Sequence, residues 1–85
     1  MTAAPAPKRS ADGRPAIGVL LREQRASRRM SQLDLAHESG VSARHLGFIE
    51  IGRAQPSREV IARLADALGL PLRERNALLL AAGYA

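Results

Sequence analysis

Residues 31–52, SQLDLAHESGVSARHLGFIEIG, decide the fold of this chain, because they predict two short helices joined by a tight turn. Ser31 and Ser42 each precede helix-forming residues, and an N-cap serine hydroxyl can accept a hydrogen bond from an unpaired N–H of the first helical turn. Gly40 lies where the chain must reverse, since glycine reaches positive φ without steric cost. The expected helices cover residues 32–39 and 43–51.

The spacing of small and apolar residues in this stretch is that of a helix-turn-helix. A small residue lies where two helices cross, a glycine occupies the turn, and apolar residues lie beneath the second helix. These inward positions fall at offsets 0, 4, 5, 10 and 13, and they are Ala36, Gly40, Val41, Leu46 and Ile49. Leu35 joins them on the inner face of the first of the two helices.

Composition predicts a small all-α fold around this motif. With 85 residues the chain is long enough for one small domain, assigned to residues 15–85, and the 2% aromatic content requires an aliphatic core. Apolar residues recur with helical spacing before and after the motif, and no stretch shows strand alternation. We expect Pro15 in a first helical position and five helices in all, the other three over residues 16–29, 58–68 and 72–82.

The last of these helices is apolar on nearly all sides. It either packs along the groove between the first and fourth helices or leaves a face for a partner, and the sequence leaves both open. Gly83 is expected to end it, with Tyr84 and Ala85 as a frayed terminus.

The charge of the chain points to a polyanionic partner. A net charge of +5 and an isoelectric point near 11.3 favour nucleic acid, although a merely soluble basic protein fits the charge equally well. Residues 1–14 are expected to form a flexible basic arm that is either a solvated tail or a minor-groove contact. The lack of cysteines, of an apolar membrane-length run and of a secretory leader makes the cytoplasm the expected location.

Several short motifs run from the start of the helix-turn-helix to the end of the helix that follows it. They are Met30-Ser31-Gln32, Leu35-Ala36, Gly40-Val41-Ser42, Ile49-Glu50 with Gly52 and Pro56, and Leu64-Ala65 with Ala67-Leu68-Gly69-Leu70. Together they resemble the lambda-repressor-like DNA-binding domain of the XRE family of bacterial and phage transcription regulators, over residues 17–70, about two-thirds of the chain. The resemblance implies a five-helix fold and DNA-binding transcriptional regulation, with repression favoured over activation. The segment 71–84 is similar to that of regulators in which a ligand-sensing domain follows, and the sequence leaves open whether the chain stands alone or is truncated.

A helix that fits the major groove reaches base edges with its outward side chains. Arg44 is the best candidate, because a guanidinium can bridge O6 and N7 of guanine, while Ala43 and Phe48 suit thymine methyl groups. His45 suits a base acceptor or a phosphate. Gly47 either lets the backbone approach DNA closely or is a tolerated weak helix residue.

Phosphate contacts are expected to flank these base contacts, at three helix starts and in the loop that follows the recognition helix. For each candidate alone, a solvated surface role competes. The candidates are Gln32, Ser42, Arg53, Gln55, Ser57 and Arg58.

Glu50 is an acid on the side of the motif that would face DNA, where it would repel phosphate. The resemblance implies that it pairs with Arg25 of the first helix and is structural. Such a pair would tie the recognition helix to the rest of the fold.

Other function classes find little support in the sequence. There is no pocket-forming carboxylate pair, no glycine-rich phosphate loop and no supported nucleophile arrangement, so we expect neither an enzyme nor a cofactor. His37 and His45 lie on different helices without a carboxylate at ligand spacing, so no metal site is expected. The alternative function is a protein-interaction adaptor or an antitoxin built on the same fold. A single small domain makes few base contacts, so we expect a homodimer on a palindromic operator.

Overall fold

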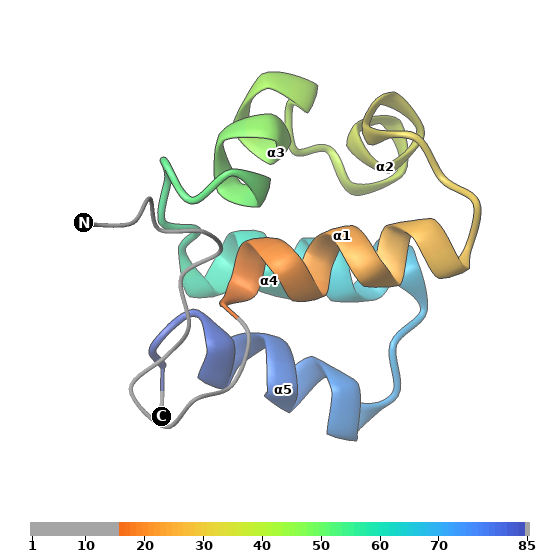
Figure 1. Cartoon of the computed structure of the whole chain (residues 1–85). Coiled ribbons are helices and arrows are strands. Elements are labelled where there is room, and N and C mark those ends of the chain that lie inside the picture. Colours follow the sequence, from red (N-terminus) through yellow and green to blue (C-terminus); the bar gives the residue numbers. More distant parts are fainter. Residues whose placement is uncertain (1–15, 85) are drawn as a thin grey trace.

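The computed structural model describes residues 16–84, which form five helices and, within that range, no strand (Figure 1). This confirms the expected all-α fold. The N-terminal arm and Pro15 lie outside the described residues. The helices are α1 (Ile17–Ser27), α2 (Gln32–Ser39), α3 (Ala43–Glu50), α4 (Arg58–Leu68) and α5 (Leu72–Ala81).

Serine caps begin α2 and α3, as the sequence predicts, and a third serine cap, Ser57, begins α4. The hydroxyl of Ser31 accepts from the backbone N–H of Asp34 at 2.9 Å, and the Asp34 carboxylate accepts in return from the N–H of Ser31 at 3.0 Å. Ser42 and Ser57 accept from the N–H groups three residues ahead, at 3.0 and 3.1 Å. Each such cap contributes about 1 kcal/mol to its helix.

The ends of the helices differ slightly from expectation. Gly40 adopts φ 77° and turns the chain between α2 and α3, as predicted. The first helix ends at Ser27 rather than 29, because Arg29 takes the left-handed conformation with φ 56°. Arg28 secures this turn by donating from Nε to the carbonyl of Leu68 at 2.7 Å. The recognition helix ends at Glu50 rather than 51, and α5 ends at Ala81 rather than 82.

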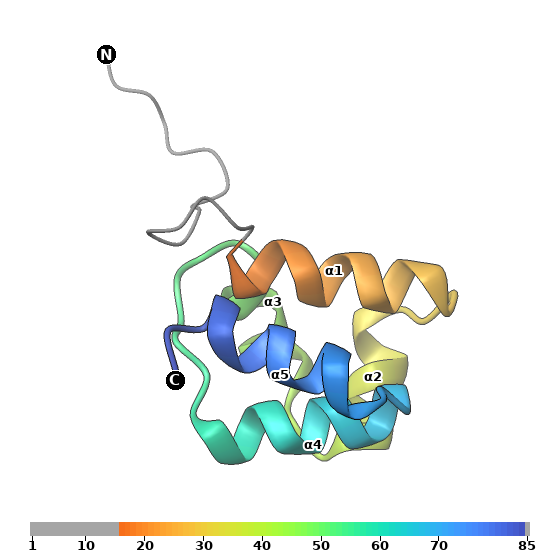
Figure 2. The same ribbon diagram turned by 90° about the horizontal axis from the view of Figure 1, so that it is seen from below.

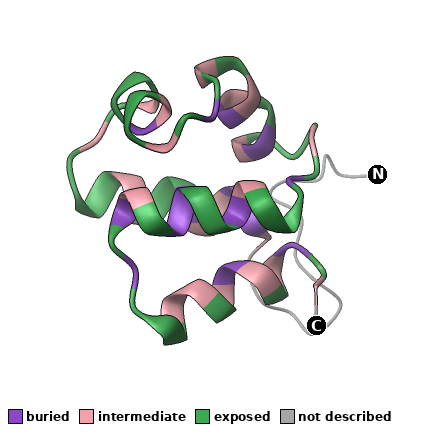
Figure 3. Cartoon of the chain, turned by 180° about the vertical axis from the view of Figure 1, so that it is seen from behind, coloured by how far each residue is buried: buried purple, intermediate pink, exposed green. Residues whose placement is uncertain are grey.

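The helices pack in three levels in Figure 1, with α2 and α3 above, α1 and α4 in the middle and α5 below. Buried residues lie on the sides of the helices that face one another, and exposed residues cover the outside (Figure 3). Each large side chain removed from water contributes about 1.5–3 kcal/mol. The fully buried side chains of the core are aliphatic: Leu21, Leu35, Leu46, Ile49, Ile61, Leu64 and Leu78.

The last helix packs along the groove between α1 and α4, which is one of the two alternatives expected for it, and a partner on its exposed side stays a prediction. It buries Leu78, yet Leu72 remains 70% exposed and Leu80 39% exposed. Among the described helices none is both long and apolar enough to cross a membrane.

The expectation of a frayed terminus is wrong for Tyr84. Its hydroxyl donates to the carbonyl of Pro56 at 2.8 Å, and its ring is half-buried against the start of α4. The sequence pattern missed this because the contact joins residues 28 apart, beyond any helical period. Ala85 lies outside the described residues.

Candidate nucleic-acid interface

One face of α3 is fixed to the core and to α1. The side chains of Leu46 and Ile49 are fully buried, as predicted from their spacing. Behind them, Gly18 of α1 lies so close to the end of α3 that a Cβ there would be 2.5 Å from the carbonyl oxygen of Ile49 and 2.7 Å from that of Glu50. Gly18 is not among the residues that the sequence singles out, and its one visible signal is a glycine inside an otherwise regular helix.

The predicted pair of Arg25 and Glu50 is present and bidentate. Nε of Arg25 donates to Oε2 of Glu50 at 2.8 Å, and Nη2 donates to Oε1 at 2.9 Å. The remaining terminal nitrogen, Nη1, donates to the carbonyl of Met30 at 2.8 Å. One guanidinium of α1 therefore holds both α3 and the turn that precedes α2. The side chain of Arg25 is only 16% exposed and that of Glu50 only 4%, so the loss of either one would leave the other as a buried charge without its partner.

Hydrogen bonds keep this buried carboxylate ionised. Burial raises the pKa of Glu50, but hydrogen bonds from Arg25 and Gln32, and the positive charges of Arg25 and Arg22, outweigh burial and lower the pKa below its usual value. The hydrogen bond to Glu50 raises the pKa of Arg25, against the opposing effect of burial. A charged Glu50 is therefore part of the fold at neutral pH.

The opposite face of α3 is open to solvent and carries the predicted base-contacting residues. Arg44 and Phe48 are exposed, and the guanidinium carbon of Arg44 lies 5.5 Å from the centroid of the Phe48 ring. Ala43, His45 and Gly47 are half-buried. A Cβ on Gly47 would meet its nearest neighbour, Oε1 of Gln32, at an ordinary 3.5 Å.

The turn after α3 fixes the direction in which the chain leaves the helix. Gly52 adopts φ 80° and donates from its N–H to the carbonyl of Ile49 at 3.1 Å. The next N–H, from Arg53, donates to the carbonyl of Phe48 at 2.8 Å. These two bonds form a Schellman motif, which places the exposed Arg53 directly beyond the recognition helix.

The predicted phosphate-contacting residues fall into two groups in the structure. Arg53 and Arg58 are exposed, whereas the two glutamine amides already have intramolecular partners. Nε2 of Gln32 donates to Oε1 of Glu50 at 3.0 Å, and that of Gln55 donates to the carbonyl of Ala82. Ser42 and Ser57 use their hydroxyl oxygens as caps. Contact of any of the six with DNA stays a prediction.

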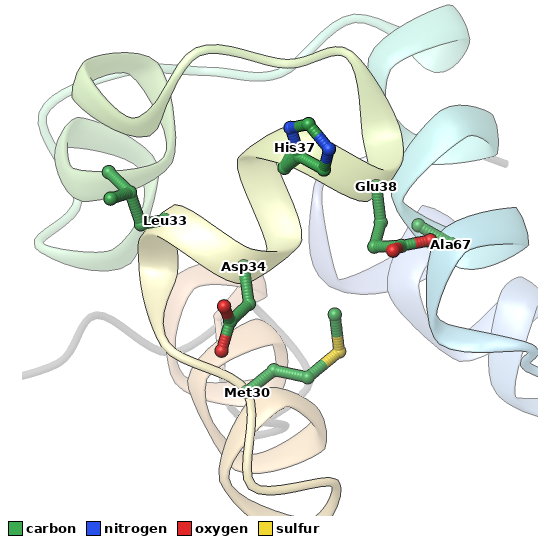
Figure 4. A pocket seen from close by; sticks show the side chains of 6 residues that line it. All are labelled: Met30, Leu33, Asp34, His37, Glu38 and Ala67. Atoms are coloured by element: carbon green, nitrogen blue, oxygen red, sulfur yellow. The ribbon is translucent and has the colours of Figure 1, made fainter.

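An open pocket lined mainly by residues of α2 has acidic residues in its lining, unlike the exposed face of α3 (Figure 4). Its lining includes Asp34 and Glu38, both acidic, and the exposed His37. Hydrogen bonds from the backbone and side chain of Ser31 lower the pKa of Asp34, so that carboxylate is anionic. Two acids make this pocket unsuited to a phosphate backbone.

Comparison with known proteins agrees with this geometry. The chain is 36% identical over 69 residues to an uncharacterized HTH-type transcriptional regulator of Mycobacterium tuberculosis, with 81% of this chain and 27% of the relative aligned. It is 33% identical over 56 residues to the ImmF control region 10 kDa protein of Bacillus phage phi105, with 66% of this chain and 62% of that protein aligned. The chain thus spans about a quarter of the mycobacterial relative.

A solved structure is similar over most of its length. The restriction-modification controller protein C.AhdI from Aeromonas hydrophila superposes with a TM-score of 0.66 and 37% identity, over 69% of this chain and 89% of that one. Residues 16–78 match the family described as "Helix-turn-helix domain", which includes α1 to α4 and most of α5. The chain therefore belongs to the helix-turn-helix domain family, as its resemblance to the lambda-repressor-like XRE regulators predicts.

Proposed function

We propose that this domain binds double-stranded DNA in a sequence-specific manner, as a transcriptional regulator, with α3 in the major groove. The observation that supports this proposal is that α3 has one anchored face and one exposed face. One face is held by buried side chains and by the Arg25–Glu50 pair, and the opposite face presents Arg44 and Phe48 to solvent. A short helix anchored in this way can enter the groove without losing its place in the fold.

Arg44 is the central base-contacting residue of the proposal. Its guanidinium can donate two parallel hydrogen bonds to O6 and N7 of guanine. The Phe48 ring at 5.5 Å limits the motion of the arginine before binding, which reduces the ordering entropy that association must overcome. Ala43, His45 and Gly47 complete the surface that would lie along the bases.

Phosphate contacts would bracket the recognition helix. Backbone N–H groups of the first turn of α2, near Gln32, and the exposed cations Arg53 and Arg58 suit the two sides of the groove. The amide of Gln32 has a second N–H beyond the one that Glu50 accepts. Ser42, Gln55 and Ser57 would add contacts from their backbone groups.

The experiment is selection of bound sequences from a random duplex pool, followed by affinity measurements over a range of salt concentrations. A sequence-specific reader enriches a defined motif, and its affinity falls steeply with salt because phosphate contacts release counterions. Arg44→Ala should relax the preference at one base position by about 1–3 kcal/mol. Arg73→Ala, which removes an exposed arginine of α5, is the matched control and should leave the preference intact. Enrichment of no motif would contradict the proposal.

We propose further that binding is dimeric, that the operator is palindromic and that its occupation represses transcription. One recognition helix offers few base contacts, so two copies on half-sites about one helical turn apart, ~10 bp, give the needed specificity. Size-exclusion chromatography of the chain with and without the selected duplex tests this. A complex with one chain per duplex would contradict it.

A second candidate function is a protein-interaction adaptor or antitoxin-type module. Exposed Leu72 and Leu80 on α5 favour it, as does 30% identity over 60 residues to a Debaryomyces hansenii protein named multiprotein-bridging factor 1, of which the chain covers 40%. These leucines would contact a partner or a following domain. An adaptor would bind no duplex even at low salt, which separates the two functions.

A further inference from the structure

The C-terminal end of α5 lies beside the segment that joins α3 to α4 (Figures 1 and 2). The carbonyl of Ala82 accepts a hydrogen bond from the side-chain amide of Gln55, and the hydroxyl of Tyr84 donates to the carbonyl of Pro56 at 2.8 Å. Pro56 itself is fully buried. The start of α4 is therefore tied to residues at the far end of the chain.

The backbone at the end of α5 places Tyr84 for this contact. Gly83 adopts φ 92°, and its N–H donates to the carbonyl of Leu80 at 2.9 Å. The N–H of Tyr84 donates to the carbonyl of Leu79, also at 2.9 Å. This pair of bonds is a Schellman motif, so Tyr84 is fixed through both its backbone and its hydroxyl.

The ring of Tyr84 packs against the guanidinium of Arg58, the first residue of α4. The guanidinium carbon of Arg58 lies 4.9 Å from the ring centroid, within cation–π range. All five N–H donors of a guanidinium lie in its plane, so a ring against one flat side leaves them available. The side chain of Arg58 is exposed, so its donors are open to solvent.

We propose that Tyr84 is a positioning residue for DNA binding, whose ring holds the Arg58 guanidinium in place for a backbone phosphate at the start of α4. This inference rests on the proposed function. A free arginine side chain loses rotamer entropy when it is ordered at an interface, and a side chain already held against a ring loses less. Tyr84 thus acts through Arg58 and makes no contact with DNA.

A double-mutant cycle on the full chain tests this, with the duplex selected from the random pool as the probe. Tyr84→Leu should weaken binding about two- to fivefold when Arg58 is present, the value of an exposed cation–π contact. In the Arg58→Gln background, Tyr84→Leu should cause no further loss. Arg58→Gln should also reduce the slope of log affinity against log salt by about 1. An equal loss from Tyr84→Leu in both backgrounds would overturn the proposal, because Tyr84 would then act independently of Arg58.

Two further variants separate positioning from general stability. Tyr84→Phe keeps the ring and loses the hydroxyl, so it should retain the coupling to Arg58 even if its melting temperature falls. A loss of coupling as complete as in Tyr84→Leu would overturn the role of the ring. Arg73→Gln makes the same charge change on α5, and in that background Tyr84→Leu should weaken binding as it does in the wild type.

The cycle also distinguishes the failure of this inference from failure of the proposed function. If the wild-type chain selects and binds no duplex, the proposed function fails and this inference fails with it. If the wild-type chain binds and the two substitutions are additive, only the role of Tyr84 is overturned.

Discussion

Two glycines, Gly18 behind α3 and Gly47 within it, show how differently the two faces of the helix are built. Gly18 lies behind the helix, where a Cβ would be 2.5 Å from a backbone oxygen that cannot move aside as a flexible side-chain end could. Gly47 lies within the helix, where a Cβ would make an ordinary 3.5 Å contact with a glutamine side chain. The first glycine is required by the fold, whereas nothing in the fold requires the second.

This difference separates two kinds of residue in one short helix. On the inner face, Leu46, Ile49 and Glu50 of α3 are buried or paired, and the end of the helix fits closely against Gly18 and Arg25 of α1. On the outer face, Arg44 and Phe48 are exposed to solvent, with the guanidinium carbon of Arg44 at 5.5 Å from the centroid of the Phe48 ring. We expect inner-face substitutions to change stability with little effect on sequence preference, and outer-face substitutions to do the reverse.

The largest effect is expected from Glu50→Ala. This change leaves the guanidinium of Arg25, only 16% exposed, without its carboxylate, and loss of one partner of a buried pair costs about 3–5 kcal/mol. For a domain of this size the melting temperature should fall by more than about 10 °C. Thermal denaturation followed by circular dichroism measures this. Unchanged melting together with an altered sequence preference would show that Glu50 belongs to the outer, DNA-facing set.

Gly18→Ala should come next. The added methyl group must push α1 away from the end of α3, and such overpacking costs about 1–3 kcal/mol, against which a gain of up to about 1 kcal/mol in helix propensity acts. Chemical denaturation should give a lower midpoint than the wild type. Equal or higher stability would mean that the two helices have room to separate, and that the inner face is not closely fitted.

Acid should lower the free energy of unfolding, in part through protonation of Glu50. Because the pKa of Glu50 is lowered in the folded state, its ion pair contributes fully above the ordinary glutamate pKa of about 4.3 and is lost as pH falls through the lower folded value. Glu50→Gln cannot titrate, so the stability difference between it and the wild type should narrow below about pH 4. A difference that stays constant from pH 7 to pH 3 would contradict the assignment.

Much of the inner face could be predicted from sequence, because its signals are local or periodic. The serine caps, Gly40 and the buried positions of α3 follow from spacing within one or two helical turns. The Arg25–Glu50 pair joins residues 25 apart, and its prediction came from family resemblance. Gly18 was missed because the close approach of α1 to α3 depends on how two helices cross, which no local pattern specifies.

Contacts between residues far apart in sequence also escape prediction at the candidate interface, as the partners of Gln32, Gln55 and Tyr84 show. Polar residues at exposed helix starts and loops are reasonable phosphate contacts by type, and the two glutamines were predicted on that basis. Their amides nevertheless bond to Glu50 and Ala82, residues 18 and 27 positions away. None of the residues next to Tyr84 in sequence indicates that its hydroxyl donates to the carbonyl of Pro56, which lies 28 residues away.

The smallest effect, and the one of opposite sign, is expected from Gly47→Ala. Since the added methyl group meets only ordinary contact, the free protein should gain up to about 1 kcal/mol from the better helix former. If the backbone of α3 approaches the bases closely at Gly47, the same methyl group should weaken binding to the selected duplex while the melting temperature rises. Melting and affinity measured on the same preparation distinguish this from a tolerated weak residue, for which stability rises and affinity is unchanged. A fall in stability would show that Gly47, like Gly18, lies in a closely fitted part of the fold, and the two faces of α3 would then differ less than their contacts indicate.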